Sequence, residues 1–471
     1  MVFNSLTFIL FFAIVLALFT MPFSWTTRKV ILLIASYLFY AAWNPPFIIL
    51  LWISTVVDWW AANRIAHASN AWRRRAWMMV SVTANLGMLG WFKYGEFFLK
   101  NFQALAASIG IEYQPPAFDI VLPVGISFYT FATMSYTLDV YLRRSQPTRK
   151  LLDFSLFVTF FPHLVAGPIM RPTELVPQFQ QPRRPTADQL RFGLALMTLG
   201  LFQKVVLADG FLAAPAEQLF DGTKVPGALD AWMGTLAFSG QIFCDFAGYS
   251  TTAIGAALCL GFKMPDNFRF PYAAVGFSDF WRRWHITLSS WLRDYLYIPL
   301  GGNRHGERRT YFALMMTMLL GGLWHGANWT FVVWGGLHGL YLAAERGLRK
   351  ICGDYRPGPL TFLMLGLLTY ALVNVTWVFF RANTFDKAWV VLKGMFGLNV
   401  SPEPILAAVS LVTVAVIVGG IVFAHWRMRT RTLESLVTAT PAPVIALVWA
   451  VMAFAIVIEQ GTGNAFIYFQ F

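Results

Sequence analysis

Two histidines are the residues of this sequence best suited to move protons. His285 and His325 lie within residues 276–330, a mostly apolar stretch, and each directly follows a tryptophan. The ordinary pKa of histidine is about 6.5, and burial away from water lowers it. A buried imidazole is therefore neutral at physiological pH and can accept a proton. The structural alternatives are a hydrogen bond to a neighbouring helix for His325 and an interfacial place on an amphipathic helix for His285.

The other histidines and the cysteines fit structural roles better. His338 follows Trp334 by one helical turn, which favours a packing or helix-pairing residue. His163 is interpreted in the same way, and Pro162 beside it indicates a bend. Cys244, Cys259 and Cys352 show no metal-ligand spacing, so no metal site is expected.

The residues around His285 predict one amphipathic helix. At 100° per residue, the segment separates into an apolar face and a polar face. The apolar face holds Trp281, Trp284, His285, Leu288, Trp291, Leu292 and Tyr295, and the polar face holds Arg282, Arg283, Ser289, Ser290, Arg293 and Asp294. Ser278 and Asp279 suit the start of this helix because they answer the unpaired amide donors there. The segment 299–302, PLGG, predicts its end.

The surroundings of His325 predict a helix end or a tight contact between helices. Residues 311–342 contain no Asp, Glu, Lys or Arg, and this run is too long for one ordinary membrane span. Gly321, Gly322 and Gly326 bracket the histidine and allow a break or a very close helix approach.

Composition places the whole chain in the membrane. Hydrophobic residues make up 57% and charged residues 13%, which excludes an ordinary soluble domain. The net charge of +13 comes from short basic clusters between apolar runs, which argues against nucleic acid as a partner. Clusters such as 28–29 and 73–75 are interpreted as linkers at cytoplasmic ends. The apolar runs predict an all-α polytopic protein with about 11–13 transmembrane or re-entrant helices.

Six segments carry more specific motifs. They are SFYTFATMSYTLDVYLR at 127–143, FPHLVAGPIMRP at 161–172, DFAGYSTTAIGAALCLGF at 245–262, FSDFWRRWHITLSSWLRDYLYIPLGGNR at 277–304, GLWHGANWTFVVWG at 322–335 and FIYFQF at 466–471. In this order they resemble the membrane-bound O-acyltransferase (MBOAT) superfamily, and more closely its bacterial branch that modifies cell-surface polymers. That branch includes the membrane subunits of alginate O-acetylation.

The resemblance implies a fold and a set of site residues. The fold is a single transmembrane domain over 1–471, a ring of helices around a central tunnel, with a catalytic core at about 120–345 and an aromatic tail at 461–471. His325 matches the essential histidine near the narrowest point, and His285 matches the second polar residue of the active site. Tyr468 matches a tyrosine proposed to carry the acyl group as an ester, with an interfacial aromatic belt as the alternative. The expected substrate-binding residues are Trp324, Trp281, Trp284, Arg282 and Asn328.

The resemblance also implies the reaction and its partners. Acyl transfer to a hydroxyl requires a base, an acid for the leaving thiolate, and donors for the oxyanion, and His325 is expected to be the base. His285 is expected to orient the acyl donor or to polarise its carbonyl. The donor is acetyl-CoA or another acyl thioester, with no tightly bound cofactor. A secreted or membrane-tethered partner of the SGNH type then places the group on a polysaccharide outside the cell inner (cytoplasmic) membrane. Arg282 and nearby arginines fit donor phosphates or lipid headgroups equally well.

Several alternatives remain at this point. Peptidoglycan O-acetylation and D-alanyl transfer to teichoic acid would use the same scaffold as acetylation of an alginate-like polysaccharide. A transporter or polymer channel is the rival from another class. It would show paired broken helices in two related halves, and the sequence shows no such halves.

Overall fold

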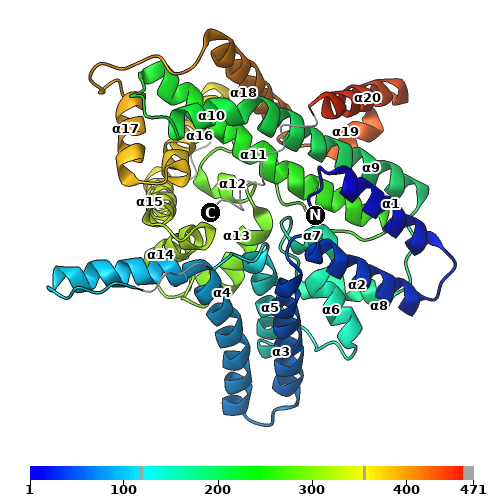
Figure 1. Ribbon diagram of the computed structural model, residues 1–471. Helices are drawn as coiled ribbons and strands as arrows, with labels where there is room; N and C mark the ends of the chain where they lie inside the picture. The colour runs from blue at the N-terminus through cyan, green and yellow to red at the C-terminus, as the bar shows by residue number, and fades with distance from the viewer. Residues whose placement is uncertain (116–119, 354–356, 460–471) are drawn as a thin grey trace. The chain divides into compact units, whose positions relative to one another are not determined.

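The protein is built from helices. The computed structural model describes residues 1–115, 120–353 and 357–459, and no strand occurs in these ranges (Figure 1). Their contacts divide the chain into two compact units. One comprises Met1–Leu194 with Ala253–Pro265, and the other comprises Ala195–Thr252 with Asp266–Phe471. The predicted all-α class is confirmed, whereas a single domain with a ring and a tunnel stays a prediction.

The first unit contains the N-terminal helices. Serine and asparagine side chains cap several of them and satisfy amide donors that a helix leaves unpaired: Ser5 caps α1, Ser24 caps α2 and Asn70 caps α4. The elements are α1 (Leu6–Thr20), α2 (Trp25–Ala41), η1 (Pro45–Phe47), α3 (Ile48–His67), α4 (Ala71–Ser108), α5 (Ile126–Tyr141), α6 (Leu151–Thr159), α7 (Phe161–Leu164) and α8 (Pro172–Gln180).

Contrary to the sequence prediction, neither of the basic clusters 28–29 and 73–75 lies in a linker, since residues 73–75 lie near the start of α4. Arg28 and Lys29 were expected in a linker, but both lie inside α2 and are buried. The Lys29 ammonium forms an ion pair with Asp153 of α6, and the Arg28 guanidinium donates to the carbonyl of Met21 at 2.8 Å. Burial is tolerated because each cation has a hydrogen-bonding partner inside the unit.

The second unit contains both histidines of the 276–330 stretch. Helices α9 (Ala187–Leu201) and α11 (Ala228–Cys259) contribute residues to both units. The other elements are η2 (Phe202–Leu212), α10 (Ala213–Phe220), η3 (Pro271–Ala273), α12 (Phe277–Trp281), α13 (Ile286–Leu292), η4 (Arg293–Tyr297), α14 (Glu307–His325), α15 (Trp329–Cys352), α16 (Pro359–Arg381), α17 (Phe385–Met395), α18 (Ala408–Met428), α19 (Leu433–Ala439) and α20 (Ala442–Ile458).

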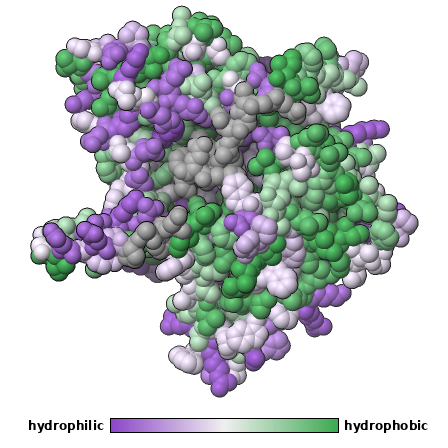
Figure 2. All heavy atoms as spheres, viewed as in Figure 1, coloured by the Kyte–Doolittle hydropathy of each residue, from purple (hydrophilic) through white to green (hydrophobic). Residues whose placement is uncertain are grey.

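Long apolar helices confirm a multi-pass membrane protein. Within the described residues, five helical segments are long and apolar enough to cross a bilayer: Pro45–His67, Ala187–Phe220, Ala228–Cys259, Pro359–Arg381 and Ala408–Met428. Figure 2 shows apolar residues on the surface over α1, where Leu6, Leu10 and Ile14 are exposed. Such surfaces suit contact with lipid chains. The count of 11–13 spans or re-entrant helices stays a prediction.

Candidate active site

The segment around His285 is not the continuous helix that its periodicity predicted. Helix α12 ends at Trp281, and α13 begins at Ile286. Between them His285 adopts a left-handed backbone, with φ of +43°, a conformation that a non-glycine residue rarely takes. The 267–269 segment forms backbone hydrogen bonds with residues on both sides of His285. The Ile286 amide donates to the Asn267 carbonyl at 2.9 Å, and the Arg269 amide donates to the Arg283 carbonyl at 2.9 Å. These hydrogen bonds to a segment outside the predicted helix interrupt it, although the amphipathic pattern continues through His285.

The start of α12 also differs from the prediction. Gly276 precedes the helix with φ of +87°, so Ser278 does not cap it. Instead, the amide of Ser278 donates to the Glu345 carboxylate of α15 at 2.9 Å. Asp279 does lie in the first turn, and its carboxylate accepts from the Val275 amide at 3.0 Å. A carboxylate from a helix distant in sequence therefore accepts the hydrogen bond of an amide at the start of α12, where the sequence predicted a local serine cap.

The His285 ring is fully buried and has a defined polar neighbour. Its Nδ1 lies 3.1 Å from Oδ1 of Asn267. The Phe246 ring packs against it in a T-shaped arrangement at a centroid distance of 4.7 Å. His285 lies outside the five candidate spans, and burial lowers its pKa to about 3. The imidazole is therefore neutral at physiological pH, as expected from its type and surroundings.

His325 is the last residue of α14, which confirms the predicted helix end. The short segment 326–328 turns the chain into α15, and the two helices run back along each other. They approach closely because glycines face each other: a Cβ on Gly322 would collide with the Phe331 carbonyl and approach the Cα of Gly335. Small residues of this kind let helix backbones come close together. The predicted glycine contact is thus confirmed together with the break.

Aromatic rings surround His325, which is 2% exposed. Its ring lies 5.1 Å from that of Trp324, 5.0 Å from that of Trp334 and 5.3 Å from that of Phe380, measured between centroids. The Trp324 ring also lies 6.0 Å from the His285 ring. The two histidines therefore share Trp324 as a neighbour.

Trp281 and Trp284 join the same aromatic cluster. The Trp281 ring contacts that of Trp334 at 5.8 Å, and the Trp284 ring contacts that of Trp377 at 5.0 Å. Trp334 and Trp377 stack at 5.9 Å. The structure thus brings together five of the predicted site residues: His325, His285, Trp324, Trp281 and Trp284.

The remaining predicted site residues lie differently. Asn328 caps α15, since its Oδ1 accepts from the Thr330 amide at 3.1 Å and its Nδ2 donates to the Asn383 carbonyl at 3.0 Å. Arg282 is exposed just after α12. Tyr468 lies outside the described residues. The contacts of Asn328 are those of a residue that holds the backbone beside His325.

His338 has the helix-pairing place that the sequence indicated. It is fully buried on α15, and its Nε2 lies 3.0 Å from the Thr376 hydroxyl of α16. Its ring packs against those of Phe280, Trp281 and Trp334. His338 therefore borders the aromatic cluster while it joins two helices.

Sequence reasoning missed Asn267 and a buried charge cluster. Asn267 lies 18 positions before His285 within PDNFRF, a polar segment that is typical of a loop. In η2, a π-helix, Lys204 and Asp209 are five residues apart and share a face. The Lys204 ammonium lies 2.8 Å from the Asp209 carboxylate and 2.5 Å from that of Asp245. The apolar pattern of 190–209 gave no signal for this cluster.

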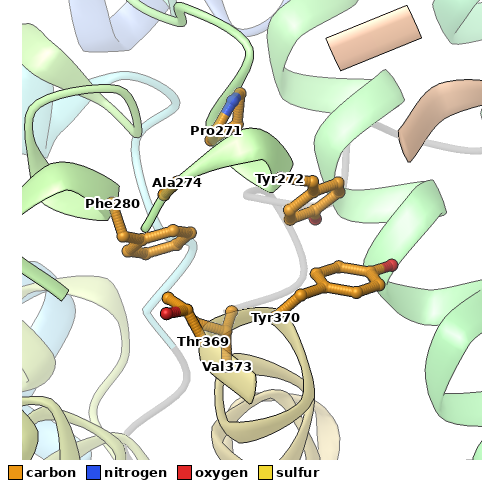
Figure 3. A pocket seen from close by; sticks show the side chains of 7 residues that line it. All are labelled: Pro271, Tyr272, Ala274, Phe280, Thr369, Tyr370 and Val373. Atoms are coloured by element: carbon orange, nitrogen blue, oxygen red, sulfur yellow. The ribbon is translucent and has the colours of Figure 1, made fainter. Parts of the chain in front are cut away.

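A small pocket lies beside the aromatic cluster (Figure 3). Phe280 stacks on Trp284 of the cluster and also lines the pocket. The other lining residues are Pro271, Tyr272, Ala274, Thr369, Tyr370 and Val373. Neither His285 nor His325 lines this pocket, and the predicted tunnel to His325 stays a prediction.

This arrangement suits proton transfer in a site with little water. Two imidazoles flank one indole ring, and aromatic side chains exclude solvent around them. In such surroundings electrostatic interactions are stronger than in water. Among the described residues, no group of His, Cys, Asp or Glu is arranged to hold a metal ion.

Comparison with known proteins gives the same family as the motifs. A sequence model of MBOAT, the membrane-bound O-acyltransferase family, matches residues 143–367. The probable alginate O-acetylase AlgI of Azotobacter vinelandii is 44% identical over 79% of this chain and 73% of its own length. The protein of the same name from Pseudomonas aeruginosa is 43% identical over 85% of this chain and 75% of its own length. The peptidoglycan O-acetyltransferase of Helicobacter pylori is 38% identical over 79% and 74%, respectively. With identity this high over most of both sequences, the chain belongs to the membrane-bound O-acyltransferase family and is an O-acyltransferase.

Proposed function

We propose that this protein O-acetylates an exported, alginate-like polysaccharide by carrying acetyl groups across the cell inner membrane. The names of its relatives support acetyl as the group and alginate as the polymer class. Peptidoglycan is the alternative acceptor, because the Helicobacter pylori relative is named for it. D-alanyl transfer is the less favoured alternative, since the three relatives compared above are named for O-acetylation.

The observation that carries the proposal is the position of His325. It ends α14 inside a shell of aromatic rings, and the ring of a second buried histidine, His285, also contacts that of Trp324. A neutral imidazole in dry surroundings is a suitable base for a hydroxyl group. His325 takes the proton of the acceptor hydroxyl while the hydroxyl oxygen forms a bond to the carbonyl carbon of the acetyl group. The bond from that carbon to the thioester sulfur breaks, and the proton passes to the thiolate.

The donor is acetyl-CoA, bound from the cytoplasmic side. Trp324 lines the reacting position beside both histidines, while Trp281 and Trp284 shape the wall behind it. Arg282 is exposed and contacts the donor's phosphates, with lipid headgroups as its alternative ligand. Asn328 holds the start of α15 beside the base.

On the far side, Tyr468 carries the acetyl group as an ester or a partner receives it directly. A phenol has a pKa of about 10 and attacks a thioester only with the help of a base. His325 is that base in the tyrosine route. An SGNH-type partner then transfers the group to the polysaccharide.

The test is His325→Ala in the full chain, reconstituted in vesicles with acetyl-CoA and the secreted partner. Loss of general base catalysis should lower acetyl-CoA consumption by about 100-fold or more. His338→Gln is the matched control, because it changes a buried histidine of the same cluster and keeps a side chain able to pair with Thr376. Its turnover should stay close to that of the unchanged protein. Full turnover in a folded His325→Ala variant would exclude the role of this residue. Consumption of a D-alanyl thioester instead of acetyl-CoA would reassign the transferred group.

A further inference from the structure

The side-chain amide of Asn267 is orientated by the groups around it. Its Oδ1 lies 3.4 Å from the backbone nitrogen of Thr287 and 2.8 Å from the Thr287 hydroxyl. A backbone N–H only donates, so the atom facing it must be the amide oxygen. At its other end, the amide Nδ2 donates to the Ser250 hydroxyl of α11 at 3.1 Å. The amide is thus held at both ends.

This orientation determines which nitrogen of His285 carries the hydrogen. An amide oxygen cannot donate, and His285 Nδ1 lies 3.1 Å from it. The hydrogen of this contact therefore belongs to Nδ1. A neutral imidazole has only one N–H, so Nε2 holds the lone pair. The hydrogen bond made by one ring nitrogen sets the chemistry of the other.

We propose that Asn267 is a positioning residue that keeps His285 in its Nδ1–H form, so that Nε2 accepts a hydrogen bond from an N–H or O–H group of the substrates. This inference rests on the proposed function. It replaces the expectation that His285 polarises the acyl carbonyl, because that role requires an N–H at Nε2. An acyl thioester with amide groups and an acceptor alcohol both supply such donors.

The backbone around His285 supports a dedicated arrangement. The carbonyl of Asn267 accepts from the Ile286 amide, while its side chain accepts from Thr287. Asn267 therefore holds the two residues that directly follow the left-handed position at His285. Left-handed residues other than glycine persist only where the surroundings hold them, and they cluster at functional sites.

Other charged groups bear on the protonation of this ring. Asp245 flanks Phe246, whose ring packs on His285, and Lys204 pairs with that carboxylate. Asp266 and Arg269 flank the 267–268 segment, and His325 follows Trp324. Arg283, two residues before His285, is paired with Asp279. Substitution at position 267 leaves all of these groups in place.

Asn267→Asp in the full chain tests the inference through pH. A carboxylate against Nδ1 favours the imidazolium, which raises the pKa of His285 and removes the lone pair at Nε2 at low pH. From about 3, a carboxylate neighbour raises this pKa by about two units, so acetyl-CoA turnover relative to the unchanged protein should rise about tenfold between about pH 4 and about pH 6. A ratio that falls with pH would show that His285 acts as a donor, and a constant ratio would show that Asn267 is only structural. Either result overturns the inference.

Two controls separate this inference from the proposed function. Ser250→Ala removes the other partner of Asn267 without adding charge, so its relative turnover should not depend on pH. The proposed function fails if the unchanged protein shows no His325-dependent consumption of acetyl-CoA. This outcome does not depend on the result for the Asn267 variant.

A spectroscopic readout applies even if Asn267→Asp does not fold. The nitrogen-15 spectrum of the histidine-labelled, unchanged protein reports which ring nitrogen carries hydrogen. The signal of His285 is identified by its loss in His285→Gln. Hydrogen on Nδ1 supports the inference, and hydrogen on Nε2 of a neutral ring overturns it.

Discussion

The first unit contains a buried polar cluster that differs in kind from the histidine site of the second unit. Asp58 on α3 is fully buried, and its carboxylate accepts from Ser81 and Asn85 of α4 and from Thr137 of α5. Asn85 in turn accepts from Ser54 and Thr133. Short polar side chains therefore satisfy one another and join three helices.

The histidine site follows a different principle. Aromatic rings enclose His285 and His325, and backbone features place them: a left-handed residue in one case and a glycine contact between helices in the other. Buried polar groups that satisfy each other specify a packing arrangement. The imidazole of His285, set among aromatic rings, stays neutral at physiological pH because burial lowers its pKa. The surroundings of these buried polar groups, more than their burial, therefore separate the enclosed imidazoles of the second unit from the mutually bonded side chains of the first.

The largest expected effect comes from widening the glycine contact that places His325. A Cβ on Gly335 would collide with the Met318 carbonyl of α14, so Gly335→Ala should push α14 and α15 apart. A displacement of about 1 Å at a reacting group can lower the rate about 100-fold. Acetyl-CoA turnover per folded molecule is the measurement. At neighbouring Gly336, a Cβ would only touch Leu319 at 3.4 Å, so Gly336→Ala should retain turnover. Equal losses in the two variants would contradict the importance of this contact.

In the first unit, substitution of Asp58 is expected to lower stability without lowering turnover. Asp58→Asn replaces one acceptor oxygen with a donor against groups that already donate, so it should destabilise the protein by about 1–3 kcal/mol. Turnover per folded molecule should not change. Thermal unfolding in detergent measures the first quantity, and the vesicle assay measures the second. Thr55→Val is the control, because the Thr55 hydroxyl donates only within α3, to the Leu51 carbonyl at 2.6 Å. A loss of turnover without a loss of stability would contradict a purely structural role of the Asp58 cluster.

Much of the histidine site could be predicted from the sequence because its signals are local. Uncharged residues and clustered glycines around position 325 predicted a helix end, and α14 ends there. The amphipathic pattern around position 285 failed, because the backbone bonds that break the helix come from Asn267, 18 residues away. Asp58 gave no signal for the same reason. Its partners lie on two other helices, and a lone aspartate in an apolar run does not indicate which donors will reach it.

The smallest expected effect lies at the exposed start of α14, far along the helix from His325. The Glu307 carboxylate lies 3.2 Å from the Arg346 guanidinium and 2.9 Å from the Lys350 ammonium. Hydrogen bonds from Arg346 and then Lys350 lower the pKa of Glu307 from 4.5 to about 2. Because the folded pKa lies below the unfolded value, these contacts stabilise the protein above about pH 4.5, and the contribution is lost as the pH falls toward about 2.

Glu307→Gln should therefore lower the unfolding temperature slightly at neutral pH, and the difference should shrink in acid. It should also shrink in about 1 M salt, which screens exposed charges. Turnover should be unchanged, since the substitution alters neither the aromatic shell nor the glycine contact. A clear loss of turnover would mean that charges at the start of α14 influence His325, the proposed base, at its end. In that case groups far along α14, and not only the aromatic rings around His325, would contribute to the difference between the histidine site and the Asp58 cluster.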